Sequence, residues 1–186
     1  MAATAKDAPE GLGRIRAASR FLKNLTTLGA VLILGFGIAF AVFPVWFDQL
    51  IGSAFPELTI ATGITPVKRA GLLVLMAFPL AVTLYGLWHA RLLFASYEKG
   101  EVFTGRAAGH IRLVGLAMLI NAILSVVVHT LGSILLTYDN MAGSRAIAIS
   151  LSSDTYSLVL TGGLLIVIGW VMREAARLSK ENRQFV

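Results

Sequence analysis

Four polar residues that could act together recur at four-residue intervals in the third long apolar segment: Asn121, Ser125, His129 and Ser133. This spacing predicts that they share one face of a helix. In a bilayer such groups face the packed interior and bond across helices. Two interpretations stay open: a hydrogen-bonded seam that joins helices, or a polar core that senses or conducts a small solute or proton. His129 is the residue to test for the second interpretation, because imidazole can titrate near neutral pH.

Other catalytic and ligand-binding patterns are weak. His89 and His110 lie at similar depth on either side of the central polar segment, but the third histidine is about 24 Å deeper along its helix. A haem held between paired histidines is therefore not expected. The carboxylates nearest the apolar segments, Glu98, Glu101 and Glu174, have no metal-ligand spacing with histidine. The sequence contains no cysteine. It predicts a protein that is not an enzyme and needs no cofactor or metal.

Composition points to the membrane. Of the 186 residues, 56% are hydrophobic and 14% are charged, whereas soluble domains average about 25% charged. The charges are segregated, which leaves four long uncharged runs. The net charge of +6 does not indicate direct binding of nucleic acid, because the basic residues flank apolar runs instead of forming a patch. Orientation in a bilayer explains them better.

The predicted fold class is an all-α membrane protein with four transmembrane helices, arranged as two antiparallel hairpins. We expect a basic N-terminal segment at residues 1–24, in which residues 14–23 form a separate interfacial helix. The transmembrane domain covers residues 25–173, and a helical tail covers residues 174–186. The four spans are expected at residues 25–43, 70–90, 113–136 and 156–172.

The distribution of basic residues predicts the topology. The N-terminal segment, the central bridge and the tail together hold 13 Lys and Arg residues, and the two remaining connections hold 3. By the positive-inside rule, both termini and the bridge face the cytoplasm. The predicted location is a bacterial inner membrane, crossed several times.

The two outer connections, residues 44–68 and 137–155, are long for loops without structure of their own. Residues 59–62 (Thr-Ile-Ala-Thr) and 146–150 (Ala-Ile-Ala-Ile-Ser) have a composition that suits strands. We expect them to pair as a small outer β-ribbon, and the alternative is two irregular loops.

The central bridge has clear start and stop signals. Gly100 predicts a left-handed end to the second long helix, and Thr104 predicts the N-cap of the next. In the tail, Arg177 lies three residues after Glu174 and four before Glu181, as in a solvated helix.

Small residues are frequent in the first and last spans, where they allow close approach of helices. The sequence does not say whether these contacts lie within one molecule or between copies. The glycines concerned are Gly29, Gly35, Gly37, Gly162, Gly163 and Gly169.

The bridge and the tail resemble a known family. Residues 84–88 (Leu-Tyr-Gly-Leu-Trp) lead into 91–94 (Arg-Leu-Leu-Phe) and then 97–104 (Tyr-Glu-Lys-Gly-Glu-Val-Phe-Thr). This run is similar to the core signature of DUF2975, a family of bacterial membrane proteins, and residues 170–186 resemble its C-terminal signature. The resemblance covers roughly residues 25–186. It implies a four-helix inner-membrane protein without established activity, often encoded beside a small helix-turn-helix regulator.

From these features we expect a regulatory or sensor-like membrane component that engages a cytoplasmic protein partner, such as a helix-turn-helix transcription regulator. Two alternatives remain: a small transporter or channel that uses the polar stripe, and an accessory subunit of a larger membrane complex. A homo-oligomer also stays open. The candidate partner-binding residues are Tyr97, Glu98, Glu101, Phe103, Arg177 and Glu181.

Overall fold

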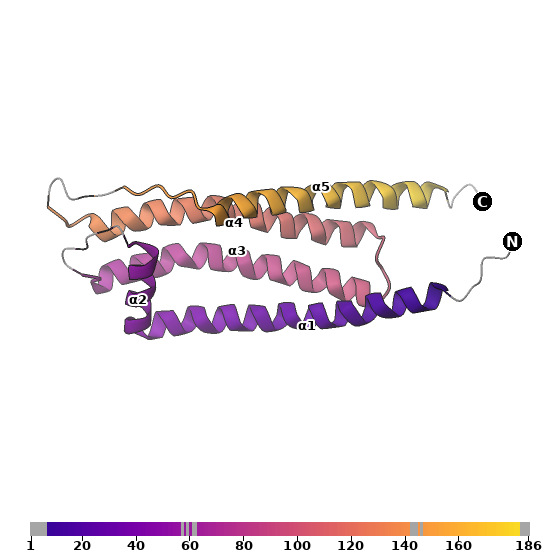
Figure 1. Cartoon of the computed structure of the whole chain (residues 1–186), viewed down its shortest axis with the longest axis horizontal. Coiled ribbons are helices and arrows are strands. Elements are labelled where there is room, and N and C mark those ends of the chain that lie inside the picture. Colours follow the sequence, from indigo (N-terminus) through magenta and orange to yellow (C-terminus); the bar gives the residue numbers. More distant parts are fainter. Residues whose placement is uncertain are drawn as a thin grey trace.

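The computed structural model describes residues 7–56, 58, 60, 63–141, 145 and 147–182. Four long helices and one short helix make up most of this part of the chain (Figure 1). They are α1 (Asp7–Val42), α2 (Pro44–Ala54), α3 (Pro66–Glu98), α4 (Gly105–Thr137) and α5 (Ser153–Asn182).

The four long helices lie in an open row. α1 packs against α3, α3 against α4, and α4 against α5, each antiparallel to its neighbour. Over the described residues, α1 and α5 share no contact, so the two hairpins do not close into a ring. The start of α1, the end of α5 and the link between α3 and α4 lie at one end of the row, which we call the bridge end. The opposite end, crossed by α2, is the α2 end.

The described part of the chain has four helices that are long and apolar enough to cross a bilayer, as predicted, which gives it the architecture of a multi-pass membrane protein. Each is longer than the expected span. α3 and α4 have 33 residues and are therefore about 50 Å long, whereas the hydrocarbon core is about 30 Å thick. The excess places several turns outside the hydrocarbon. The candidate spans are Gly13–Val42, Pro66–Glu98, Gly105–Thr137 and Ser153–Ser179.

Residues 14–23 are helical, as predicted, but they do not form a short helix of their own. These residues belong to α1, which runs without a break from Asp7 to Val42. The sequence between residues 14 and 36 holds no proline and only two glycines, so nothing in it ends the helix.

The α2 end contains a cluster of buried apolar side chains. α2 begins with a proline, which suits the first turn of a helix. It lays Phe47 and Ile51 against the ends of α3 and α4, which contribute Leu72 and Leu136. All four side chains are at most 1% exposed, and Phe55 joins them.

Ion pairs brace the same end. The Nζ atom of Lys68, a side chain that is fully buried, lies 2.6 Å from Oδ1 of Asp139. Arg69 donates to both carboxylate oxygens of Asp48 on α2, at 2.9 and 3.2 Å. In the sequence these two basic residues indicate only the topology. The structure shows that they tie the start of α3 to the turn that follows α4 and to α2.

The predicted outer β-ribbon is not present: no strand occurs in the parts of the outer connections that the structure describes. Much of the first connection is helix α2 instead. In the second, the backbone N–H of Ala148 donates to the Ser133 hydroxyl at 3.0 Å, and its carbonyl lies 3.3 Å from Nδ1 of His129. Side chains of α4 thus use backbone groups that a strand would need. Thr59, Ala61, Thr62 and Ala146 lie outside the described residues.

Candidate functional site at the bridge end

The second long helix ends as the sequence predicts. α3 stops at Glu98, and Gly100 takes a φ of 84°, a backbone conformation that favours glycine. The backbone N–H of Glu101 donates to the Ser96 carbonyl at 3.0 Å, and that of Gly100 donates to the Tyr97 carbonyl at 2.9 Å. These two bonds form a Schellman motif, which fixes the direction in which the chain leaves the helix.

The next helix is capped at the predicted residue. The Thr104 side chain accepts a hydrogen bond from the backbone N–H of Ala107 at 3.2 Å. Residues 101–103 are therefore held between a fixed helix stop and a fixed helix start. Phe103, in this short link, is 80% exposed, and Glu101 is exposed beside it. The link presents an aromatic ring and a carboxylate on a rigid support.

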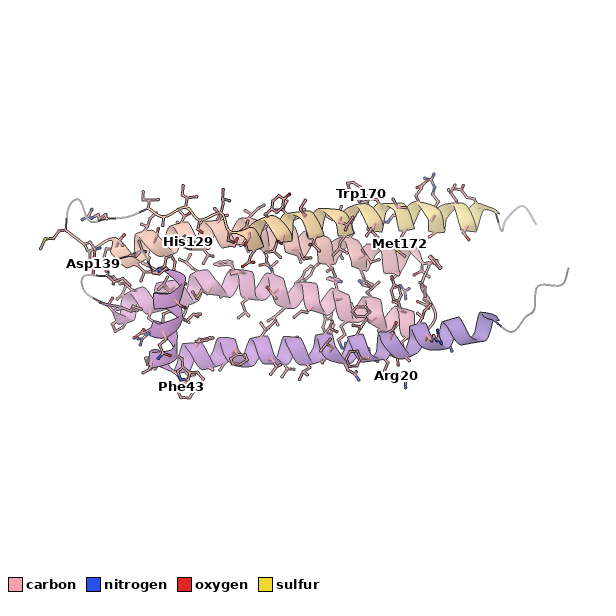
Figure 2. The ribbon with its side chains drawn as sticks, viewed as in Figure 1. Arg20, Phe43, His129, Asp139, Trp170 and Met172 are labelled. Carbon is pink, nitrogen blue, oxygen red and sulfur yellow. The ribbon has the colours of Figure 1, made fainter. Side chains whose placement is uncertain are left out.

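Glu98, another predicted partner-binding residue, is already engaged within the molecule. Its carboxylate accepts from Nε of Arg20 at 3.0 Å and from Nζ of Lys23 at 2.5 Å, both on α1. We call these three residues the Glu98 cluster; Arg20 is labelled on α1 in Figure 2. Arg16 lies one turn away, close to Gly100. Sequence reasoning missed this contact, although the spacing of residues 16, 20 and 23 places three cations on one helix face.

The two predicted residues on α5 form a second surface. Arg177 pairs with Glu174 at 2.7 Å and with Glu181 at 3.6 Å, which confirms the predicted spacing. All three side chains are more than half exposed. In the described chain α5 contacts α4 but neither α1 nor α3. Arg177 and Glu181 are therefore not part of the surface formed by Tyr97, which is half-buried, and the link.

Two of the three histidines meet between α3 and α4. Nδ1 of His89 lies 3.0 Å from Nδ1 of His110, and the Tyr85 ring packs edge-on against His89 at 4.5 Å between centroids. One imidazole donates and the other accepts, since a neutral ring has one N–H. The pair could offer two nitrogens to a metal, but the described residues contain no group of three or more potential metal ligands.

The polar stripe of α4 does not act as one face. Asn121 donates to Thr83 of α3 at 3.0 Å, whereas Ser125 lies 3.2 Å from the Thr155 hydroxyl on α5. His129 and Ser133 bond to the backbone of Ala148. Each four-residue step turns about 40° beyond a full circle, because an α-helix has about 3.6 residues per turn. Over three such steps the stripe rotates about 120° around α4, so that it begins facing α3 and ends facing α5 and the second outer connection.

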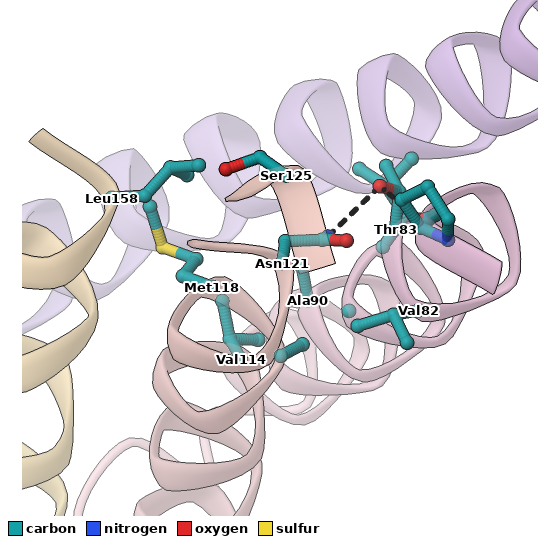
Figure 3. A pocket seen from close by; sticks show the side chains of 12 residues that line it. Val82, Thr83, Ala90, Val114, Met118, Asn121, Ser125 and Leu158 are labelled. Carbon is teal, nitrogen blue, oxygen red and sulfur yellow. Dashed lines mark hydrogen bonds between the residues drawn. The ribbon is translucent and has the colours of Figure 1, made fainter. Parts of the chain in front are cut away.

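The stripe also borders two different cavities. Asn121 and Ser125 line a cavity of about 480 Å³ between α3, α4 and α5, in which Figure 3 shows the bond from Asn121 to Thr83. His129 lines another of about 560 Å³ at the α2 end, where it stacks on Phe55 at 4.6 Å between centroids. The residues are thus not brought together around one polar path.

The family model of DUF2975, described as a protein of unknown function, matches residues 44–184. The chain belongs to the DUF2975 family. No curated protein and no solved structure matches it.

The DUF2975 match begins at α2 and runs through α5, so it is shorter than the predicted coverage from residue 25 and leaves α1 out. Both stretches that carry the predicted resemblance lie at the bridge end. Residues 84–104 form the last turns of α3 and the link, and residues 170–182 form the last turns of α5.

Proposed function

We propose that this DUF2975 protein is a non-enzymatic membrane component that recruits a cytoplasmic protein partner through its bridge end. The excess of basic residues at the bridge and both terminal segments supports a cytoplasmic position for this end. The two stretches that resemble the family signatures lie there too. We propose a small helix-turn-helix regulator as the partner, held at the membrane and released by a signal.

The observation that carries the proposal is the exposure of Phe103 on the rigid link. Along α3, Arg69 and Arg91 are about 33 Å apart, which matches the thickness of the hydrocarbon core of about 30 Å. α3 then rises about 10 Å more before it ends at Glu98. Phe103 therefore lies outside the hydrocarbon, where an aromatic ring that is 80% exposed to water is a ready anchor for a protein surface.

The chemistry of the link defines the partner's surface. Phe103 requires an apolar pocket, and the exposed carboxylate of Glu101 favours a basic residue at the rim of that pocket. Glu98 contributes less, because Arg20 and Lys23 already neutralise it. Arg177 and Glu181 would touch a partner only if it also reaches α5.

The test is affinity purification of the tagged protein from its native membrane in a gentle detergent, followed by mass spectrometry. We expect a helix-turn-helix protein to accompany the wild type and the Phe43→Ala control, and to be lost from Phe103→Ala and reduced in Glu101→Ala. Phe43 is also an exposed phenylalanine, at 51%, but it lies at the α2 end.

If Phe103→Ala recovered as much of the helix-turn-helix protein as the wild type does, the link would not be the binding surface. Recovery of envelope or respiratory subunits in place of a regulator would favour an accessory subunit. The polar stripe gives less support to a transporter, because its four residues bond to different elements and border two cavities.

A further inference from the structure

A groove between α1 and α3 opens in the half of the molecule nearer the bridge end. Its volume is about 470 Å³, and its walls are largely apolar, with Val31 and Leu34 on α1 and Leu84 and Leu87 on α3. A second apolar groove of about 510 Å³ continues along the same two helices toward α2 and shares Leu34. Together the two grooves form a long apolar surface beside the contact between α1 and α3.

One charged residue, Arg91, lines the groove, and it lies at the end nearer the bridge. Its Nε donates to the Thr27 hydroxyl at 3.1 Å, and that hydroxyl donates to the Lys23 carbonyl at 2.9 Å. The guanidinium also lies over the Trp88 ring, 5.6 Å from its centroid. These contacts fix the orientation of Arg91 and use its Nε, leaving the terminal nitrogens to meet another group.

No carboxylate among the described residues pairs with Arg91. The nearest acidic group along α3 is Glu98, about 10 Å further along the helix axis, and its charge is balanced by Arg20 and Lys23. Arg91 is therefore a half-buried cation without a counter-ion among the described residues. A guanidinium in this state favours an anion that can accept two parallel N–H bonds, such as a phosphate.

The depth of Arg91 identifies the source of that phosphate. Arg91 lies about 33 Å from Arg69 along α3, so the two arginines are one hydrocarbon thickness apart. Trp88, one turn deeper and 57% exposed, has the place of an interfacial aromatic residue. Arg91 therefore lies at the plane of the lipid phosphates, and the groove runs from it into the hydrocarbon.

We propose that the groove is a specific phospholipid site. The Arg91 terminal nitrogens bind the phosphate, and one acyl chain fills the apolar groove between α1 and α3. An anionic headgroup is preferred over a zwitterionic one, because the latter brings its own cation to an arginine that lacks a counter-ion. This inference goes beyond the proposed partner binding and does not depend on it.

The test uses Trp88 as the reporter. In the full-length chain with Trp46→Phe and Trp170→Phe, Trp88 is the remaining tryptophan. Phosphatidylglycerol with brominated acyl chains, which quench tryptophan on contact, is titrated into delipidated protein in micelles. Phosphatidylcholine with the same chains is the comparison, and unbrominated lipids correct for other changes in fluorescence. We expect saturable quenching at lower concentrations of phosphatidylglycerol.

Two variants and a control separate the headgroup from the chain. Arg91→Gln should weaken phosphatidylglycerol binding about tenfold, the loss expected for hydrogen bonds to a charged group. Arg106→Gln removes the same charge from an exposed site near the bridge and should have no effect. Ala30→Phe, which fills the groove, should weaken both lipids. Circular dichroism and gel filtration check that each variant is folded.

Native mass spectrometry gives an independent readout, because a specific site retains one phosphatidylglycerol per chain and Arg91→Gln loses it. Equal affinities for the two lipids, or an unchanged affinity in both Arg91→Gln and Ala30→Phe, would overturn the proposal.

Discussion

The α4/α5 interface and the α1/α3 interface of this protein are built in opposite ways. Between α4 and α5, glycines let the backbones touch: a Cβ atom on Gly115 would lie 2.6 Å from the Gly162 carbonyl oxygen. Between α1 and α3, side chains leave grooves of about 470 and 510 Å³. A Cβ atom on Gly29 or Gly35 of α1 would meet no described atom of another helix within 4 Å.

The difference shows how each helix is held. In a bilayer, helices associate by close packing because lipid tails are as apolar as the side chains. In the most apolar stretch of α4, 22% of the residues are buried, against 0% in that of α1. α1 packs against α3, and its two ends are also held, by α2 on one side and by the Glu98 cluster on the other. It is also the helix that the DUF2975 match leaves out. We infer that, of the four long helices, α1 requires the least free energy to move.

The largest effect is expected where α2 anchors the end of α1. Phe47→Ala removes a side chain that is 0% exposed from the cluster around Leu72 and Leu136. The loss should be about 3–5 kcal/mol in the free energy of unfolding, as for other buried phenylalanines. Reversible denaturation in mixed micelles measures it. The matched control is Phe43→Ala, which truncates a ring that is half exposed and should cost far less. Equal losses would mean that α2 is not an anchor.

A medium effect is expected at the close contact of α4 and α5. Gly115→Ala forces a methyl group against the Gly162 backbone, which cannot move aside as a side chain could. The cost should be about 1–3 kcal/mol, as for other overpacked sites. The control, Gly163→Ala, adds the same methyl next to Gly162 but into open space. It should raise stability by about 0.5–1 kcal/mol, because alanine is the better helix former. If both variants were destabilised, the loss at Gly115 could not be attributed to its close contact with the Gly162 backbone.

These glycines show what a sequence can and cannot tell. Uncharged runs indicate four spans, and the caps at Gly100 and Thr104 follow from local backbone chemistry, so the number of candidate spans and both caps were predicted correctly. Lipid-facing and helix-facing positions are equally apolar, however. The sequence therefore did not show that Gly162 and Gly169 face α4 closely while a Cβ atom on Gly163 or Gly29 would point into open space, or that the helices form an open row.

Polar contacts at the two ends were missed for another reason. Basic residues near spans have a general explanation in membrane orientation. Because that explanation was sufficient, it gave no reason to predict ion pairs of Lys68 with Asp139, or of Arg20 and Lys23 with Glu98. Whether two such charges meet depends on how helices are placed side by side, which no local pattern encodes. α2 was missed although Pro44 is a helix-start signal, because in the first outer connection only residues 59–62 were given a secondary structure, that of a strand.

The smallest effect is expected at the bridge end of α1, where the Glu98 cluster is partly exposed to water. Glu98→Gln removes the charge that Arg20 and Lys23 share, which should free the start of α1 from the end of α3 with little loss of global stability. Because the sequence has no cysteine, spin labels can be placed at Phe21→Cys and Phe103→Cys, two exposed positions. At low ionic strength the distance distribution between the labels should be narrow in the otherwise unchanged chain and broader in Glu98→Gln.

Salt and a neighbouring carboxylate provide the controls for this measurement. At about 1 M salt, where charges are screened beyond about 3 Å, part of the difference between the two chains should disappear. Glu101→Gln removes an exposed carboxylate from the same link, where no ion pair with a described residue involves it, and should leave the distribution narrow. An equally narrow distribution in Glu98→Gln would mean that packing, rather than charge, holds this end of α1. The contrast with the α4/α5 interface would then be one of degree, because α1 would be held along its length as α5 is.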